Sequence, residues 1–329
     1  MNYCYPHFPA RQSNQEGVDS TYGESVADTS ESLRSSIFHY QYENGRRYHS
    51  FHKGSYAMPN DETEQDRLDL QHHIYLLCLG GELHLAPLCD PQRVLDIGTG
   101  TGLWAMEFAD RFPGSIVIGT DLTPIQPRFV PPNLKFYIDD MELPWAYGKD
   151  ERFDYIHWRS LGGSTGNWHR LYEQAMESLN PGAYLEVHEH DMCVYSDDDQ
   201  NLDKAPWTKE WLRRLSEASV QNGKPIDVAC YQRQLMEDAG LVDVTEKIVK
   251  VPIGQWTRDS HLKEIGSFER LHMNVSVEAY SLALFTRLLG YSYDQANALF
   301  AMVCNEMNDR SLHLYTMYRF LIGRKPLGA

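Results

Sequence analysis

The spacing of apolar and polar positions between residues 93 and 191 predicts strands that alternate with helices. Short apolar runs bounded by turn residues are typical of buried strands, and apolar positions three and four apart are typical of helices. Such alternation favours right-handed βαβ crossovers and a mostly parallel sheet, an α/β fold. The expected strands are 93–98, 115–122, 134–140, 152–159 and 183–191, with helices at 103–112 and 167–179.

The last third of the chain continues the sheet but adds a block of helices. We expect a helix at 228–240, two strands at 244–254 and 312–325, which bring the sheet to seven, and helices at 276–289 and 294–308. The segment at about 258–308 would form a helical lid at the sheet edge, before the last strand. Its run SLALFTRLL (281–289) is too apolar for an exposed helix. It must pack against the sheet edge or against a second subunit, which leaves a homodimer open.

The N-terminal part divides into a tail and a cover. Residues 1–35 are polar without periodicity, which predicts a disordered tail. Residues 36–92 form the cover: the stretch 37–61 is dense in aromatic rings, and a helix follows it. Asp61 is placed to cap that helix, with Glu64 three residues later. Residues 93–329 then form the sheet domain.

Composition narrows the class of protein. The chain has 329 residues, 42% of them hydrophobic, with 30 Lys and Arg against 46 Asp and Glu, a net charge of -16. This composition excludes wholesale disorder, and its charge argues against a nucleic-acid partner. No apolar run approaches the roughly 18 residues of a membrane span, so no membrane partner is expected. The six cysteines show no C-x-x-C spacing and no metal site is predicted, so we expect a cytoplasmic protein.

A glycine-rich turn carries the first chemical signal. In VLDIGTGTG (94–102) a strand runs into a turn and then into a helix, where free backbone amides can approach a ligand. A dinucleotide-binding turn needs a further glycine at Leu103, so a nicotinamide cofactor is disfavoured. Asp96, inside the strand, suits a positively charged group such as an amine. The turn residues expected to bind a cofactor are Gly98, Thr99, Gly100 and Gly102.

Acidic residues end the next two strands. Asp121 ends the second strand, where a carboxylate can accept hydrogen bonds from ribose hydroxyls. Asp139, Asp140 and Met141 end the third, and could bind an exocyclic amine and cover the face of an adenine. Because parallel strands end at one edge of a sheet, these side chains should meet there. A lone acid could equally be a solvated strand end or a helix cap.

These motifs together resemble the class I S-adenosylmethionine-dependent methyltransferases. LDIGTGTG resembles their first motif, GTDL (119–122, including Leu122) the second, and IDDME (138–142) the third. Arg159 follows the fourth strand, and LNPGAYLEVHE (179–189) resembles the fifth-strand motif, with Ala183 in place of a glycine. The resemblance implies a Rossmann-like fold with helices on both faces of the sheet, S-adenosylmethionine as the cofactor and S-adenosylhomocysteine as its product.

More specifically, the chain is similar to the fungal LaeA-like methyltransferases. The similarity lies in ENGRRYHSFHKGSY (43–56), PNDETEQDRLDLQHHIYLL (59–77), TDLTPIQPRFVPPN (120–133) and IGRKP (322–326). That family includes regulators of secondary metabolism as well as enzymes that methylate small metabolites, so the resemblance does not identify the acceptor.

The end of the fifth strand offers candidate catalytic groups. Strand alternation places His188 and His190 on one face and Glu189 on the other. A carboxylate acceptor needs no general base, whereas a phenol or an amine can need one, and histidine is the usual choice near neutral pH. The alternative is that all three are ordinary polar residues at a strand end.

The cover and the lid supply candidate pocket residues. Tyr48 is a candidate cofactor contact and Tyr56 a candidate substrate contact, with ordinary packing as the alternative. His272 and Met273 of the lid are candidate substrate contacts, with a dimer interface as the alternative.

Three functions remain at this point. The first is a methyltransferase of secondary metabolism that acts on a small molecule, at a carboxylate or hydroxyl oxygen or less readily at a nitrogen. The second is a nuclear regulator that works through protein partners. The third is a protein of the same fold that catalyses a reaction other than methylation.

Overall fold

A computed structural model describes residues 40–49 and 56–328 of the chain. The predicted tail, 1–35, lies outside the described residues, as does part of the aromatic stretch. Within the described part, no helix combines the length and apolar character needed to cross a membrane.

An eight-stranded sheet forms the centre of the molecule, in the order β5-β4-β3-β6-β7-β10-β8, with β9 paired to β10. Strands β3 to β7 are parallel, whereas β10 runs antiparallel to its three neighbours. The predicted α/β fold with a mostly parallel sheet is confirmed, with the short β8 in addition. The strands are β3 (Arg93–Ile97), β4 (Ile116–Asp121), β5 (Leu134–Ile138), β6 (Phe153–Arg159), β7 (Leu179–His190), β8 (Tyr195–Ser196), β9 (Val242–Pro252) and β10 (Leu314–Arg324).

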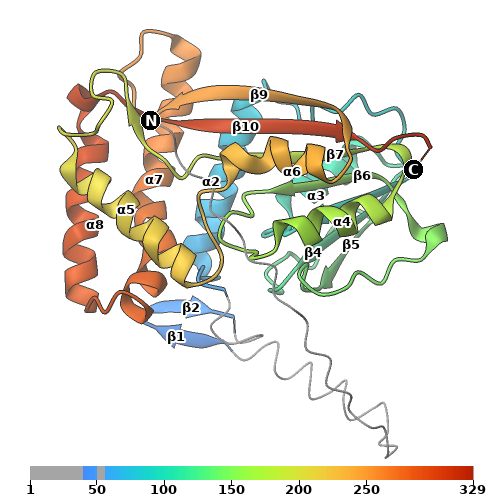
Figure 1. Cartoon of the computed structure of the whole chain (residues 1–329), viewed down its shortest axis with the longest axis horizontal. Coiled ribbons are helices and arrows are strands. Elements are labelled where there is room, and N and C mark those ends of the chain that lie inside the picture. The colour runs from blue at the N-terminus through green and yellow to red at the C-terminus, as the bar shows by residue number, and fades with distance from the viewer. Residues whose placement is uncertain (1–39, 50–55, 329) are drawn as a thin grey trace, which may run out of the picture.

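Helices cover both faces of the sheet (Figure 1). On one face, α2 (Glu62–Cys78) and α3 (Leu103–Arg111) bury rings such as Trp104 against Tyr155 of β6. On the other face, α4 (Trp168–Ser178) and α6 (Gln232–Asp238) pack against Trp158. The alternation of strand side chains between the two faces therefore builds two apolar layers.

Three helices form a separate block beside the sheet, and α2 lies between that block and the strands (Figure 1). They are α5 (Pro206–Gln221), α7 (Ser260–Arg287) and α8 (Tyr293–Asn308). Helices α7 and α8 connect β9 to β10, where the lid was expected. The apolar run of α7 is buried inside the chain, and Trp211 Nε1 donates to Ser281 Oγ at 2.7 Å. Its burial therefore needs no second subunit.

The element boundaries correct several expectations. Helix α5 was not predicted at all, and α7 begins at Ser260, sixteen residues before the expected start at 276. Gly266 lies inside this longer helix, where a Cβ would lie 2.2 Å from the Gly254 carbonyl oxygen. The glycine permits close packing inside the helix and does not end it. The helix expected at 228–240 is a 3-10 turn at Ala229–Tyr231 followed by the shorter α6.

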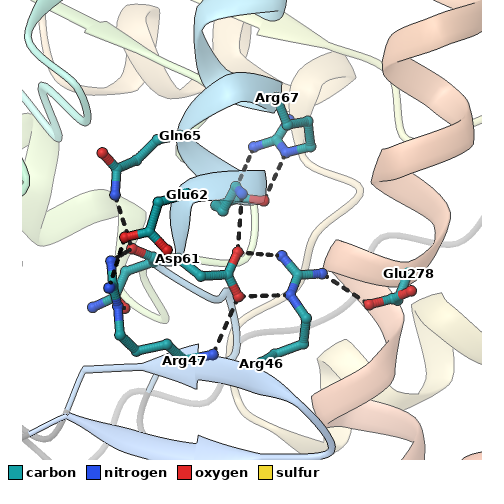
Figure 2. A network of polar contacts seen from close by, with 9 residues as sticks. Arg46, Arg47, Asp61, Glu62, Gln65, Arg67 and Glu278 are labelled. Atoms are coloured by element: carbon teal, nitrogen blue, oxygen red, sulfur yellow. Dashed lines mark hydrogen bonds and ion pairs between the residues drawn. The ribbon is translucent and has the colours of Figure 1, made fainter.

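A hairpin of β1 (Gln41–Glu43) and β2 (Arg46–Tyr48) is held to the helices by one ion-pair network (Figure 2). Arg46 binds both carboxylate oxygens of Asp61, at 2.7 and 2.9 Å, and Glu278 of α7 at 3.0 Å. Asp61 also accepts the Glu64 amide at 3.0 Å, which confirms the predicted cap of α2. We call Arg46, Asp61 and Glu278 the hairpin clamp. It joins the segment before α2 to the helical block.

Candidate functional site

One cavity lies at the carboxyl ends of the parallel strands, between the glycine turn, α2 and α7. Twelve of the residues predicted from the sequence line it: Tyr56, Asp96, Gly98, Thr99, Gly100, Asp121, Leu122, Asp139, Met141, Arg159, Glu189 and His190. Six others are not part of its lining: Tyr48, Gly102, Asp140, His188, His272 and Met273. In the described part of the chain, no group of three or more His, Cys, Asp or Glu side chains is arranged to hold a metal.

The glycine turn is held open by its backbone conformation. Gly98, Gly100 and Gly102 have φ of 64°, 60° and 83°, a region that favours glycine. A Cβ on Gly98 would lie 2.5 Å from the Leu161 side chain, so a larger residue would close this wall. Asp121 accepts the Gly100 amide at 2.8 Å. The carboxylate that faces the cavity thus also fixes the turn.

Asp96 lies at the floor of the cavity and is almost fully buried. It accepts the Thr99 hydroxyl at 2.6 Å, and its second oxygen contacts His157 Nδ1 at 2.8 Å. Burial raises the pKa of Asp96 to about 7, although the Thr99 hydrogen bond and nearby Arg159 oppose the rise. Near neutral pH this group can therefore be either an acid or a carboxylate.

The residues after β5 divide between the cavity and the surrounding loop. Asp139 and Met141 line the cavity, and burial raises the pKa of Asp139. Asp140 instead turns into the loop and accepts the Glu142 amide at 2.9 Å. Of the two acids, Asp139 is therefore the one placed to meet a ligand.

The three candidates at the end of β7 have different surroundings. His188 is buried below the cavity and contacts Glu186 at 2.7 Å. Glu189, on the opposite face, accepts the Leu161 amide at 2.8 Å, and burial raises its pKa to about 8. His190 contacts Gln71, and burial lowers its pKa to about 3, so its imidazole is neutral. Only the last two reach the cavity.

Sequence reasoning missed the polar face that α2 presents to the cavity. Glu64 and Arg67 form a two-pronged ion pair at 2.7 and 3.0 Å, and both are nearly inaccessible to solvent. Arg67 also donates to the Tyr280 hydroxyl at 3.0 Å. Gln71 follows one turn later on the same face. The available signal was the spacing of these polar residues, which is also typical of a solvated helix face.

The aromatic and lid residues fall on both sides of the cavity wall. Tyr56 lines the cavity, whereas Tyr48 is buried in β2 with the Arg287 guanidinium 4.9 Å from its ring centre. His272 accepts from Arg67 at 2.9 Å behind the wall, and Met273 packs into the core of the helical block. From α7, the residue that reaches the cavity is Tyr280.

The fold and the site together define a methyltransferase of the class I type. A family model described as a methyltransferase domain matches residues 70–246. The chain belongs to this family and, within it, to the LaeA-like methyltransferases of fungal secondary metabolism, and it is an S-adenosylmethionine-dependent methyltransferase.

Three relatives support that placement over nearly the whole chain. Methyltransferase pytC of Aspergillus terreus is 38% identical over 90% of this chain and 91% of its own. Secondary metabolism regulator LAE1 of Cochliobolus heterostrophus is 35% identical over 86% of this chain and 94% of its own length. The protein-methionine methyltransferase laeA of Emericella nidulans is 36% identical over 87% of this chain and 76% of its own length. Among solved structures, a geranyl diphosphate C-methyltransferase of Streptomyces coelicolor gives a TM-score of 0.46 at 14% identity, over 79% of this chain and 80% of that chain.

The cavity fits the cofactor of this family. The open glycine turn leaves room that a Cβ would fill, and Asp96 and Asp121 offer carboxylates on either side of it. The Arg159 side chain makes no hydrogen bond or ion pair with another side chain among the described residues, and its guanidinium lies 5.2 Å from the Tyr75 ring centre. A charged ligand with amine, carboxylate and hydroxyl groups can therefore be bound at several points.

Proposed function

We propose that this protein methylates an oxygen atom, of a carboxylate or a hydroxyl, on a small metabolite of fungal secondary metabolism. The observation that carries the proposal is that one cavity joins the glycine turn to the buried polar end of β7. The buried residues Met58 and Asn60 wall this cavity on the α2 side. A concave site lined by buried residues suits a small acceptor better than a protein surface.

The cofactor would be held by the residues around the turn. Asp96 would bind the amino group, Arg159 the carboxylate and Asp121 the ribose hydroxyls, with Asp139 and Met141 beside the adenine. When bound, S-adenosylmethionine supplies a methyl group already activated by its sulfonium. The chain then has to position the acceptor and exclude water.

The acid–base groups favour oxygen acceptors. His190, with its lowered pKa, is a neutral hydrogen-bond partner and a weak base. Glu189, with a pKa of about 8, is the group at this end that can take a proton from a hydroxyl at mildly alkaline pH. A carboxylate acceptor would need neither group as a base and would depend on orientation alone.

A second function is favoured by the regulator relatives. LAE1 is named a regulator of secondary metabolism, and laeA of Emericella nidulans a protein-methionine methyltransferase. For this chain the corresponding proposal is a nuclear protein that methylates a protein partner, whereas the small-molecule enzyme would work in the cytoplasm, alone or as a homodimer.

Radiolabelled S-adenosylmethionine distinguishes the two functions. The purified protein is incubated with a fungal metabolite extract or with a fungal protein extract, and label is followed in organic-soluble and protein fractions. The proposal expects label in an organic-soluble product, and label confined to protein would contradict it.

A pair of variants then tests the site itself. Tyr280→Phe should raise the acceptor KM while cofactor affinity is kept, because Tyr280 lines the cavity and its hydroxyl contacts Arg67 and His190, which line it too. Tyr291→Phe, which removes a hydroxyl in the helical block away from the cavity, is the matched control. Equal effects of the two variants on the acceptor KM would show that Tyr280 does not contact the acceptor.

A further inference from the structure

A row of buried titratable side chains crosses the sheet beneath the cavity. Asp96 of β3 pairs in register with His157 of β6, and His157 pairs with Glu186 of β7. His188, two residues after Glu186, points to the same face. None of these four side chains is more than 3% exposed, and the proposed function uses only Asp96 directly.

The four groups form one continuous chain of contacts. Asp96 Oδ1 lies 2.8 Å from His157 Nδ1, and His157 Nε2 lies 3.5 Å from His188 Nδ1. His188 Nε2 lies 2.7 Å from Glu186 Oε1. Each imidazole thus uses both ring nitrogens inside the chain.

Glu186 fixes the far end as a carboxylate. Besides His188, it accepts the Leu85 amide at 2.7 Å, the Ala86 amide at 2.8 Å and the Tyr155 hydroxyl at 2.9 Å. Burial alone would raise the pKa of Glu186, but the His188 contact and the two amides lower it. Because Glu186 only accepts, His188 Nε2 must carry a hydrogen.

The three contacts that link the four side chains limit where the hydrogens can be. Each contact needs one hydrogen, so three hydrogens are shared by Asp96, His157 and His188. Three arrangements satisfy all three contacts. In one, Asp96 is a carboxylic acid and both imidazoles are neutral; in the other two, Asp96 is a carboxylate and either His157 or His188 is an imidazolium. The Glu186 carboxylate beside His188 favours the positive charge on His188. All three arrangements carry one net negative charge.

We propose that this chain is an internal proton relay, through which Asp96 becomes a carboxylate when a cationic group enters the cavity. The Asp96 O–H bond breaks as His157 Nδ1–H forms, and His157 Nε2–H breaks as His188 Nδ1–H forms. The proton stays inside the protein, paired with Glu186. His157 and His188 act as positioning residues for Asp96. The inference rests on the proposed function, because the arriving cation is the amino group of S-adenosylmethionine.

The surroundings support a relay isolated from solvent. The Trp104 ring stacks on His157 with centroids 3.7 Å apart and planes 12° apart, a geometry that suits partial positive charge on the imidazole. Tyr75 and Phe320 pack around His188. Burial raises the pKa of Asp96 to about 7, so both of its forms are accessible near neutral pH. Other groups lie close enough for their charges or hydrogen bonds to affect the protonation of these four residues: Thr99, Arg159, Asp121, Tyr155, His72, His84 and Tyr75.

Calorimetry of S-adenosylmethionine binding in buffers of different ionisation enthalpy tests the relay. Wild type should release almost no proton between pH 6 and 8. In His157→Asn the asparagine can still donate to Asp96 but cannot reach His188, so ionisation of Asp96 must send its proton to solvent. This variant should release about half to one proton at pH 6 and almost none at pH 8. Its affinity should fall up to about tenfold per pH unit below the Asp96 pKa.

The control is His73→Asn, an exposed residue of α2 whose ring contacts Phe268 and none of the four relay side chains. It should behave as wild type. His188→Gln, which keeps a donor toward Glu186, is a second variant that should release a proton like His157→Asn. Proton release by wild type at pH 6 would overturn the relay. So would the absence of proton release in both His157→Asn and His188→Gln.

Nitrogen-15 spectra of histidine-labelled wild type test the hydrogen count without a substitution. Without cofactor, His157 and His188 should each show one protonated ring nitrogen, Nε2; with S-adenosylmethionine, His188 should show two. A bare His188 Nδ1 in both states would overturn the relay. Failure of wild type to bind S-adenosylmethionine would instead reject the proposed function. The cofactor-free spectrum would still decide the relay, because a bare His157 Nε2 facing a bare His188 Nδ1 contradicts the shared hydrogens.

Discussion

Replacing Arg46 with methionine should lower the thermal stability of the protein by breaking the hairpin clamp. The guanidinium makes two hydrogen bonds to Asp61 and one to Glu278. Removing one partner of a buried ion pair costs about 3–5 kcal/mol. Here Asp61 keeps the amides of Arg47 and Glu64 as donors, so we expect about 2–3 kcal/mol. At about 2 °C per kcal/mol for a large domain, the Tm should fall by about 4–6 °C.

The measurement is thermal unfolding by circular dichroism, with Glu278→Gln as the control. The Glu278 side chain is 39% exposed, so its pair with Arg46 should contribute at most about 1 kcal/mol. Burial raises the pKa of Asp61, but Arg46 and the two amides lower it overall. The stabilisation is therefore present above the unfolded pKa and is lost as pH falls through the folded one. The difference between wild type and Arg46→Met should shrink below about pH 4. Equal melting of Arg46→Met and wild type at pH 7 would refute the clamp.

Three further predictions concern the cavity. Asp121→Ala should weaken S-adenosylmethionine binding by about 1.5–3 kcal/mol in calorimetry, through lost hydrogen bonds to a charged group and a loosened Gly100; unchanged affinity would contradict its role. Gly102→Ala should lower the Tm, because the φ angle of Gly102 is 83° and the new Cβ would lie 2.4 Å from the Phe136 ring. A melting curve of the variant equal to that of wild type would show that the turn adapts to the larger side chain. With a hydroxyl acceptor, kcat should rise with pH through about 8, where Glu189 ionises, and Glu189→Gln should flatten this profile; a rise that survives the substitution would assign it to another group.

The parts predicted correctly from the sequence depend on local pattern. The strands, the glycine turn and the acids at the strand ends follow from short periodic segments, and the Asp61 cap needs only the residues beside it. Because parallel strands share one edge, local information also places Asp96 and Asp121 at one cavity. The clustering was therefore predictable before any contact was known.

The parts that were missed depend on pairing between distant segments. Glu64 and Arg67 have the spacing of a solvated helix face, but both are buried, and Arg67 contacts His272 and Tyr280 of α7. The row from Asp96 through His157 to Glu186 depends on the register of three strands, which no single segment contains. The same holds for His272, which faces Arg67 and not the cavity.

The position of β10 affects the order in which the protein can fold. This strand, residues 314–324, lies between β7 and β9 and hydrogen-bonds to both. During synthesis, β7 and β9 therefore leave the ribosome before the strand that joins them, each with an unpaired edge. Such edges can pair with other chains until they are covered. The helices α7 and α8 are made during this interval, so the helical block can form before the sheet is complete.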